Sequence, residues 1–185
     1  MRNNRKLRRS QVDRNQVLDR CLAAFVRAGT LDLSLDELAG MVGSSKRMLI
    51  HYFRGREPIE ELALTQLEER LRGQFRPDAL PKGIPLEKVM TLLWERTAHP
   101  DTRGVLLLVM SATQRAWGGS KRAQEFYRRQ QQLWADLLLA FCPDPATVEA
   151  VLQLFQGATL TYLVTGDRKK GLRAIRRFFK AGKAR

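Results

Sequence analysis

Two adjacent cations stand where a short helix is expected to begin. Lys46 and Arg47 follow Gly43, Ser44 and Ser45, a run that favours a turn and then a helix N-cap. The first turn of a helix carries roughly half a positive charge from its aligned peptide dipoles, so acidic residues are the usual choice there. Cations at that end are unfavourable in the free protein and become favourable opposite a polyanion. The pair therefore indicates a site that faces phosphates.

The residues around this pair predict a helix-turn-helix. Ser34, with Glu37 three residues on, predicts a capping box that starts one short helix, and Gly43 ends that helix. Ser44 or Ser45 then caps the next short helix. Such a turn lets the second helix lie in the major groove of DNA, about 12 Å wide, with its N-terminal end towards the bases. The residues expected to form the core behind it are Leu22, Phe25, Leu38, Ala39, Val42 and Leu49.

Residues 12–57 resemble the DNA-binding domain of the tetracycline-repressor (TetR) family of transcriptional regulators. The resemblance rests on VLDRCLAAFVRAG at 17–29, SLDELAGMVGSSKRMLIHYF at 34–53 and GREPIEEL at 55–62. It implies an all-α chain with a three-helix helix-turn-helix DNA-binding domain at 12–57 and a helical effector-binding and dimerisation domain at 58–185. It also implies a regulator, most simply a repressor, that binds a double-stranded palindromic operator as a homodimer and is released by a small molecule.

The resemblance also assigns roles to single residues. Ser34, His51 and Tyr52 are expected to contact phosphates, and Lys46 and Arg47 to approach base edges or the backbone. Arg56 is expected to anchor a strand from the start of the fourth helix. The full set of expected DNA-contacting residues is Ser34, Ser44, Ser45, Lys46, Arg47, Met48, Ile50, His51, Tyr52 and Arg56.

Three of these positions depart from the family pattern. The family commonly has a small residue where Arg47 stands, a Thr or Ser at Met48 and an aromatic residue at Ile50. Arg47 can add a bidentate contact to guanine, worth about 1–3 kcal/mol of discrimination, whereas Ile50 can only meet a thymine methyl group. The operator sequence is therefore not transferable from relatives.

The charge of the chain is concentrated at its two ends. The net charge is +14, and residues 1–57 hold 12 Lys and Arg against 6 Asp and Glu. Residues 166–185 hold 9 against 1, while residues 58–165 are balanced at 12 against 12. Segments this basic fit nucleic acid or an anionic membrane surface. Residues 1–11 are interpreted as a disordered basic arm that follows the duplex through Arg2, Arg5, Lys6, Arg8 and Arg9.

Other classes of protein find little support in the residues. The chain has only two histidines, His51 and His99, so no catalytic triad or metal-binding set assembles, and no cofactor is expected. No phosphate-binding glycine loop appears. The cysteines, Cys21 and Cys142, look like helix-face residues and not like a disulfide pair. The chain has no membrane-length apolar run and is expected to be cytoplasmic. Because no catalytic set of residues assembles, it is not expected to be an enzyme.

Helical periodicity predicts the remaining elements near 12–28, 56 to the low 70s, 85–98, 101–117, 121–142, 145–165 and 168–180. The resemblance implies an effector pocket between the middle helices, and the large residues positioned to line it are Met90, Trp94, Met110, Trp117, Trp134 and Phe155. It also implies that two C-terminal helices pair with those of a second subunit. The expected helices are 121–142 and 145–165, through Phe126, Trp134, Val148, Val151, Phe155 and Tyr162. A rival pairing uses 145–165 with 168–180, which is disfavoured because that basic segment meets its own copy.

Two alternative functions remain open at this stage. One is a basic nucleic-acid-binding protein with no operator specificity. The other is a membrane-surface protein that uses the amphipathic segment 168–180, in which Leu172, Ile175, Phe178 and Phe179 oppose a row of cations.

Overall fold

The computed structural model describes residues 2–76, 78, 80–81 and 83–182, and it describes side chains from Asp13 to Ala181 within those ranges. Every regular element in this part of the chain is helical, which confirms the predicted all-α class. None of its helices is long and apolar enough to cross a membrane.

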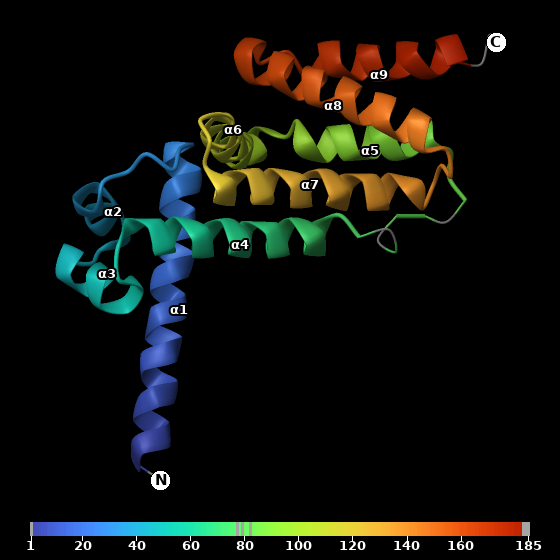
Figure 1. The fold of residues 1–185 in the computed structure, drawn as a ribbon. Helices are drawn as coiled ribbons and strands as arrows, with labels where there is room; N and C mark the ends of the chain where they lie inside the picture. The colour runs from blue at the N-terminus through green and yellow to red at the C-terminus, as the bar shows by residue number, and fades with distance from the viewer. Residues whose placement is uncertain (1, 77, 79, 82, 183–185) are drawn as a thin grey trace. The chain divides into compact units, whose positions relative to one another are not determined.

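The helices, labelled in Figure 1, divide between two compact units. Unit 1 comprises residues 1–70 and 107–126, and unit 2 comprises residues 71–106 and 127–185. The elements are α1 (Arg2–Ala28), α2 (Leu35–Val42), α3 (Lys46–Phe53), α4 (Arg56–Gln74), α5 (Leu86–Thr97), the 3-10 helix η2 (Pro100–Thr102), α6 (Arg103–Trp117), α7 (Lys121–Leu139), α8 (Pro145–Thr165) and α9 (Arg168–Gly182). The predicted functional boundary after residue 57 stays a prediction, because packing divides the chain elsewhere.

The positions of the helices follow the local signals in the sequence. Asp144 caps α8 by accepting hydrogen bonds from the backbone N–H groups of Ala146 and Thr147, and Gly166 ends α8 with φ 71°. The first helix differs from the prediction, since α1 begins at Arg2 and not near Val12. The side chains of residues 1–12 lie outside the described residues, so the DNA-tracking role of the arm stays a prediction.

The core of unit 2 is built around α8. Its side chains Val151 and Phe155 pack with α5, α7 and α9, and Ile175 of α9 is fully buried against them. Trp94 of α5 donates from its indole N–H to the carbonyl of Arg168 at 3.0 Å. A Cβ atom on Gly171 would lie 2.1 Å from the Trp94 ring, so only glycine lets α9 approach this closely.

The predicted effector-pocket residues of unit 2 belong to this core. Met90, Trp94 and Phe155 are at most 9% exposed. The ring centroids of Trp94 and Phe155 lie 5.7 Å apart, and those of Trp134 and Phe155 lie 5.9 Å apart. These aromatic side chains fill the space between the helices, so their role in an effector pocket stays a prediction that the packing does not favour.

The other two predicted pocket residues, Met110 and Trp117, belong to α6 in unit 1. Met110 is partly buried, and Trp117 is 91% exposed at the end of the helix. The pocket role of Trp117 also stays a prediction, and the exposure of its ring does not favour it.

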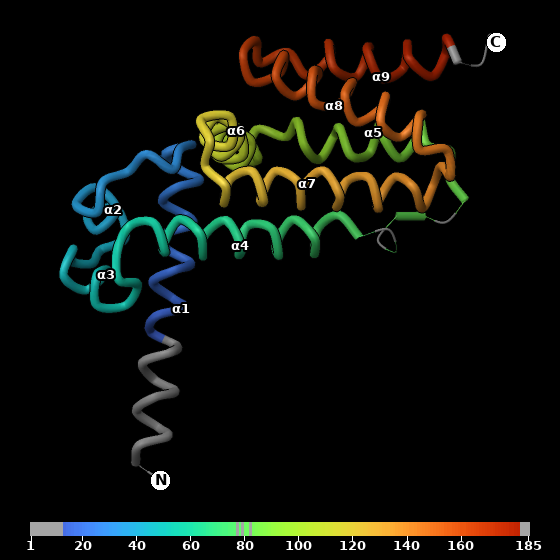
Figure 2. The backbone as a smooth tube through the Cα atoms, in the orientation of Figure 1, coloured from blue at the N-terminus to red at the C-terminus, as the bar shows by residue number. Residues whose placement is uncertain are grey.

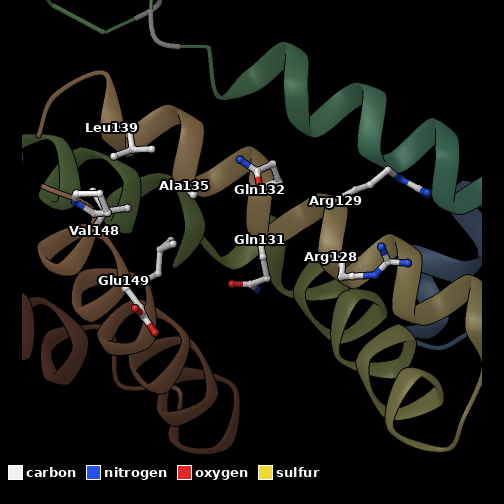
Figure 3. Close-up of a pocket in the computed structure, with 10 residues that line it drawn as sticks. Arg128, Arg129, Gln131, Gln132, Ala135, Leu139, Val148 and Glu149 are labelled. Carbon is white, nitrogen blue, oxygen red and sulfur yellow. The ribbon is translucent and has the colours of Figure 1, made fainter. Parts of the chain in front are cut away.

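An open groove lies between α7 and α8 (Figure 3). Its volume is about 600 Å³. It is lined by Arg128, Arg129, Gln131, Gln132, Ala135, Leu139, Pro145, Val148, Glu149 and Leu152. None of the six predicted pocket residues lines it.

The residues predicted to form the dimer interface are also packed in the core of a single chain. Five of the six are at most 9% exposed, namely Phe126, Val148, Val151, Phe155 and Tyr162, and Trp134 packs partly buried against the same core as Phe155. Side chains already buried in one subunit leave little surface for a second, so a dimer role for these residues stays a prediction that the packing does not favour. Periodicity had marked them as apolar without showing which neighbour covers them.

Candidate nucleic-acid interface

The helix α3 begins at Lys46, where the sequence predicted a helix start. Figure 2 shows α2 and α3 as two short coils joined by a tight turn. Gly43 ends α2 in the left-handed region with φ 64°. Ser45, and not Ser44, is the N-cap of α3, since its hydroxyl oxygen accepts a hydrogen bond from the Met48 backbone N–H at 3.2 Å. Lys46 is therefore the first residue of the helix, and the first turn of α3 contains no acidic residue.

One face of α3 is buried and the other is open. Leu49 and Phe53 are 0% and 2% exposed. The predicted core residues behind them are buried too, namely Leu22, Phe25, Leu38, Ala39 and Val42. On the open face Met48 and Ile50 are 40% and 43% exposed. Lys46, Arg47 and His51 are also exposed, while Tyr52 is half-buried.

Lys46 has a partner that the sequence did not reveal. Its Nζ atom lies 2.8 Å from Oδ2 of Asp36 on α2, with side chains 51% and 70% exposed. An exposed pair of this kind contributes about 0–1 kcal/mol, so a phosphate can compete for the lysine. In the free protein Asp36 offsets part of the unfavourable charge at the start of α3. No sequence pattern connects residues ten positions apart on two different helices.

Arg47, unlike Lys46, forms no ion pair within the described part of the chain. Its side chain is exposed, and no ion-pair partner lies near it in the described part of the chain. A guanidinium in this position presents its planar donors to whatever approaches the first turn of α3. Its geometry suits a phosphate or the O6 and N7 acceptors of guanine.

The hydroxyl oxygen of Ser34 accepts a hydrogen bond within the protein, while its hydroxyl hydrogen is free to donate one. The predicted capping box is present, with the Ser34 N–H donating to Oε2 of Glu37 at 2.8 Å and the Glu37 N–H donating to the Ser34 hydroxyl at 3.2 Å. The hydrogen bond from the Ser34 backbone holds the pKa of Glu37 below its ordinary value. The exposed hydroxyl of Ser34 remains able to donate to an incoming phosphate.

Arg56 is less available than the resemblance implied. Its Nε atom lies 2.7 Å from Oε1 of Glu60, and its Nη1 donates to the carbonyl of Leu33 at 3.4 Å. The pairing is an ion pair whose angles fall outside a good hydrogen bond, because Oε1 of Glu60 has no hydrogen-bond partner. The guanidinium is thus held against its own protein, and its side chain is 39% exposed.

Arg115 of α6 completes a partly buried charge cluster that includes Arg56. It pairs with Oε2 of Glu60, with Oδ1 of Asp32 at 2.5 Å and with the carbonyl of Leu31 at 3.1 Å. Desolvation lowers the pKa of Arg115, but its hydrogen bonds to the two carboxylates outweigh that cost and raise the pKa. We call Asp32, Arg56, Glu60 and Arg115 the charge cluster.

The far end of α3 is fixed by α1. Arg14 donates from Nε to the Tyr52 carbonyl at 3.2 Å, and its guanidinium carbon lies 5.1 Å from the centre of the Phe53 ring. A cation at the C-terminal end of a helix is favourable for the dipole. Sequence reasoning passed over Arg14 because nothing along α1 marks it as different from the neighbouring arginines.

These features together define a class of protein. A three-helix unit that buries one face of a short, well-capped helix and opens the other, led by cations, is a helix-turn-helix unit. Over 91% of its length the chain has the fold of the TetR-family transcriptional regulators, as the resemblance of residues 12–57 predicted.

Comparisons with known proteins extend the similarity beyond the helix-turn-helix to most of the chain. A TetR-family transcriptional regulator from Streptomyces coelicolor superposes with a TM-score of 0.76, at 18% identity, over 91% of this chain and 79% of that one. A Rhodococcus sp. structure described as a TetR-family regulator gives a TM-score of 0.67, at 18% identity, over 88% and 96%. No family model matches the sequence.

A curated relative gives the match at the level of sequence. The HTH-type transcriptional regulator BetI of Escherichia coli (strain K12 / DH10B) is 27% identical over 128 residues, which are 68% of this chain. The match spans 64% of that relative's length, less than two thirds. These similar proteins are named as regulators, and none of their names describes an enzyme.

Asp36→Asn is expected to tighten DNA binding. The substitution releases Lys46 and removes a negative charge beside α3, so affinity for any duplex should rise by up to about fivefold, the equivalent of about 1 kcal/mol. Fluorescence anisotropy at fixed salt measures this. Glu69→Gln removes the same charge from an exposed position on α4, and an equal gain with that control contradicts the role of the ion pair.

Arg115→Met is expected to destabilise unit 1. Glu60 is largely buried and loses one of its two cations, so the free energy of unfolding should fall by roughly 3 kcal/mol, at the lower end for breaking a buried pair because Arg115 keeps some contact with solvent. Urea denaturation measures the loss. Arg103→Met, at an exposed position of the same helix, should change stability by less than about 0.5 kcal/mol.

Arg115→Met should also make the free energy of unfolding depend less on pH under acidic conditions. The hydrogen bond from Arg115 lowers the pKa of Asp32 from 3.8. A carboxylate with a lowered pKa contributes stability above its unfolded pKa and loses it as pH falls through the folded value. The wild-type protein should therefore lose more stability below about pH 3.8 than Arg115→Met does. Equal curves would show that the pair is not formed in solution.

Proposed function

We propose that this chain is a sequence-specific DNA-binding transcriptional regulator, acting as a repressor and as a homodimer on a palindromic operator. The observation that carries the proposal is the open face of α3, which starts with Lys46 and Arg47 and continues through Met48 and Ile50. Its length and exposure suit the major groove. The names of similar proteins, including the HTH-type transcriptional regulator BetI, support the same conclusion.

Within this proposal the residues have different tasks. Arg47 reads a base, Lys46 and the hydroxyl of Ser34 hold phosphates, and Ile50 contributes apolar contact in the groove. His51 and Tyr52 lie further along α3 and contact the backbone. Arg56 contacts a phosphate only if it exchanges Glu60 for the phosphate, so its contribution is smaller than that of Lys46.

The operator test separates this function from non-specific nucleic-acid binding. Selection of bound duplexes from a random pool should yield one palindromic sequence, bound about 10³-fold or more above bulk DNA. Arg47→Ala is expected to relax one base position at a cost of about 1–3 kcal/mol, while Lys46→Ala weakens all duplexes alike. A flat preference across the pool overturns the proposal in favour of a non-specific basic protein.

We propose that the second subunit binds the exposed face of α8. Residues 150–165 contain no charged residue. The side chains of Leu160 and Val164 are 52% and 77% exposed, and Gly157 is exposed with open space around it. An uncharged face with exposed aliphatic residues is typical of the centre of a homodimer interface, from which charges are depleted. The small residue lets two copies of α8 approach closely.

Leu160→Lys combined with Val164→Lys is expected to give a monomer, because four lysines would meet across a twofold axis. Light scattering after size exclusion measures the mass. Gln74→Lys with Gln124→Lys adds the same charge at exposed positions of α4 and α7 and should leave the dimer intact. A dimer that survives the α8 substitutions shows that another face is used.

Release by a small molecule is the remaining part of the proposed function. The predicted lining residues Met90, Trp94 and Phe155 are packed together in the core, so an effector that reaches them must open it. The groove between α7 and α8 is a cavity already open to solvent in unit 2 (Figure 3).

A further inference from the structure

The outer face of α9 is a dense row of cations. Seven Lys and Arg side chains are exposed along it, namely Arg168, Lys169, Lys170, Arg173, Arg176, Arg177 and Lys180. They extend over about 18 Å at the rise of an α-helix. We call these seven residues the α9 cation row.

Little negative charge opposes the α9 cation row. Asp167 accepts hydrogen bonds from the backbone of Lys169 and Lys170 and lies 3.8 Å from Arg173. Lys169, Lys170, Arg176, Arg177 and Lys180 have no ion-pair partner in the described part of the chain. Like charges crowded on one face repel one another, and a polyanion would reverse that repulsion.

The apolar side of α9 is covered by the core of unit 2, and this helps to decide which kind of polyanion the cations could bind. Ile175 is fully buried, and Leu172, Phe178 and Phe179 pack against the core of unit 2. Figure 1 shows α9 lying along α8, in agreement with the contacts of α9 with α8 and α5. A helix that lies in a membrane surface must place its apolar side among the lipids. This one is occupied, so the membrane interpretation of segment 168–180 is disfavoured.

A single-stranded nucleic acid is also a poor match. Its recognition relies on exposed aromatic rings on which bases stack. The two rings of α9, Phe178 and Phe179, are partly buried and lie 5.2 Å from each other. What the α9 cation row offers is charge alone, which is sufficient for the phosphate backbone of a duplex.

We propose that the α9 cation row is a second DNA-binding surface, which holds the phosphate backbone of duplex DNA without reading its sequence. It is separate from α3 in the chain and belongs to unit 2, while α3 belongs to unit 1. The proposal goes beyond operator recognition and does not depend on it, because a surface of this kind acts on any duplex.

The test is the salt dependence of binding to a duplex of arbitrary sequence. The triple variant Arg173→Gln, Arg176→Gln and Arg177→Gln should reduce the slope of log affinity against log salt by about 2.7, since each lost phosphate contact removes about 0.9. Affinity should fall correspondingly at low salt. Circular dichroism and the urea midpoint establish that the variant is folded.

A matched control distinguishes a local surface from bulk charge. Lys88→Gln, Arg103→Gln and Lys121→Gln remove the same total charge from exposed positions on α5, α6 and α7. This control should leave the slope nearly unchanged. An equal loss with both triple variants, or an unchanged slope with the α9 variant, overturns the proposal.

Two further arms separate the sources of the effect. Binding to vesicles rich in anionic lipid that the α9 variant abolishes, with an unchanged slope on DNA, assigns the surface to lipid headgroups and overturns the proposal. The proposed function is tested separately, by the operator preference of the unsubstituted protein. If selection finds no preferred duplex while the α9 variant still lowers the salt slope, the α3 proposal fails and this one stands.

Discussion

The ion pairing of Glu60 is the interaction on which the arrangement of unit 1 depends. Its carboxylate is nearly buried between Arg56 and Arg115, so removing either cation leaves a negative charge with too little compensation. Through Arg115 the same cluster holds the segment between α1 and α2 at Leu31 and Asp32. It therefore fixes the start of α2, against which α3 packs. The open face of α3 is presented by this scaffold and not by α3 alone.

The elements could be predicted because their ends are set by neighbouring residues. The capping box of Ser34 and Glu37 and the left-handed Gly43 act within a few positions, so they are legible in the sequence. The two faces of α3 followed from helical period in the same way. With the resemblance of residues 12–57, this gave the fold class, which the structure and its structural neighbours confirm. It also gave the position of the candidate site, which stays a prediction.

What could not be predicted depends on contacts between distant residues. The pairing of Lys46 with Asp36, the tethering of Arg56 and the support from Arg14 leave no trace in local spacing. The same limit applies to the residues predicted for the pocket and the dimer. Period shows that Phe155 is apolar and inward, but only the packed structure shows that Trp94 and Trp134 already fill the space beside it. Conversely, Leu160 and Val164 are as apolar as the core residues of α8, and only the structure shows that they are exposed.

The three indole rings sit in very different surroundings. Trp117 is almost wholly in water at the end of α6, while Trp94 is enclosed in unit 2 with its N–H bonded to a backbone carbonyl and Trp134 is partly enclosed nearby. Indole emission shifts to longer wavelength as the ring meets solvent. Intrinsic fluorescence therefore contains a red component from unit 1 and a bluer one from unit 2. The chain carries its own optical reporters, with which loosening around α5 and α9 can be followed without any dye.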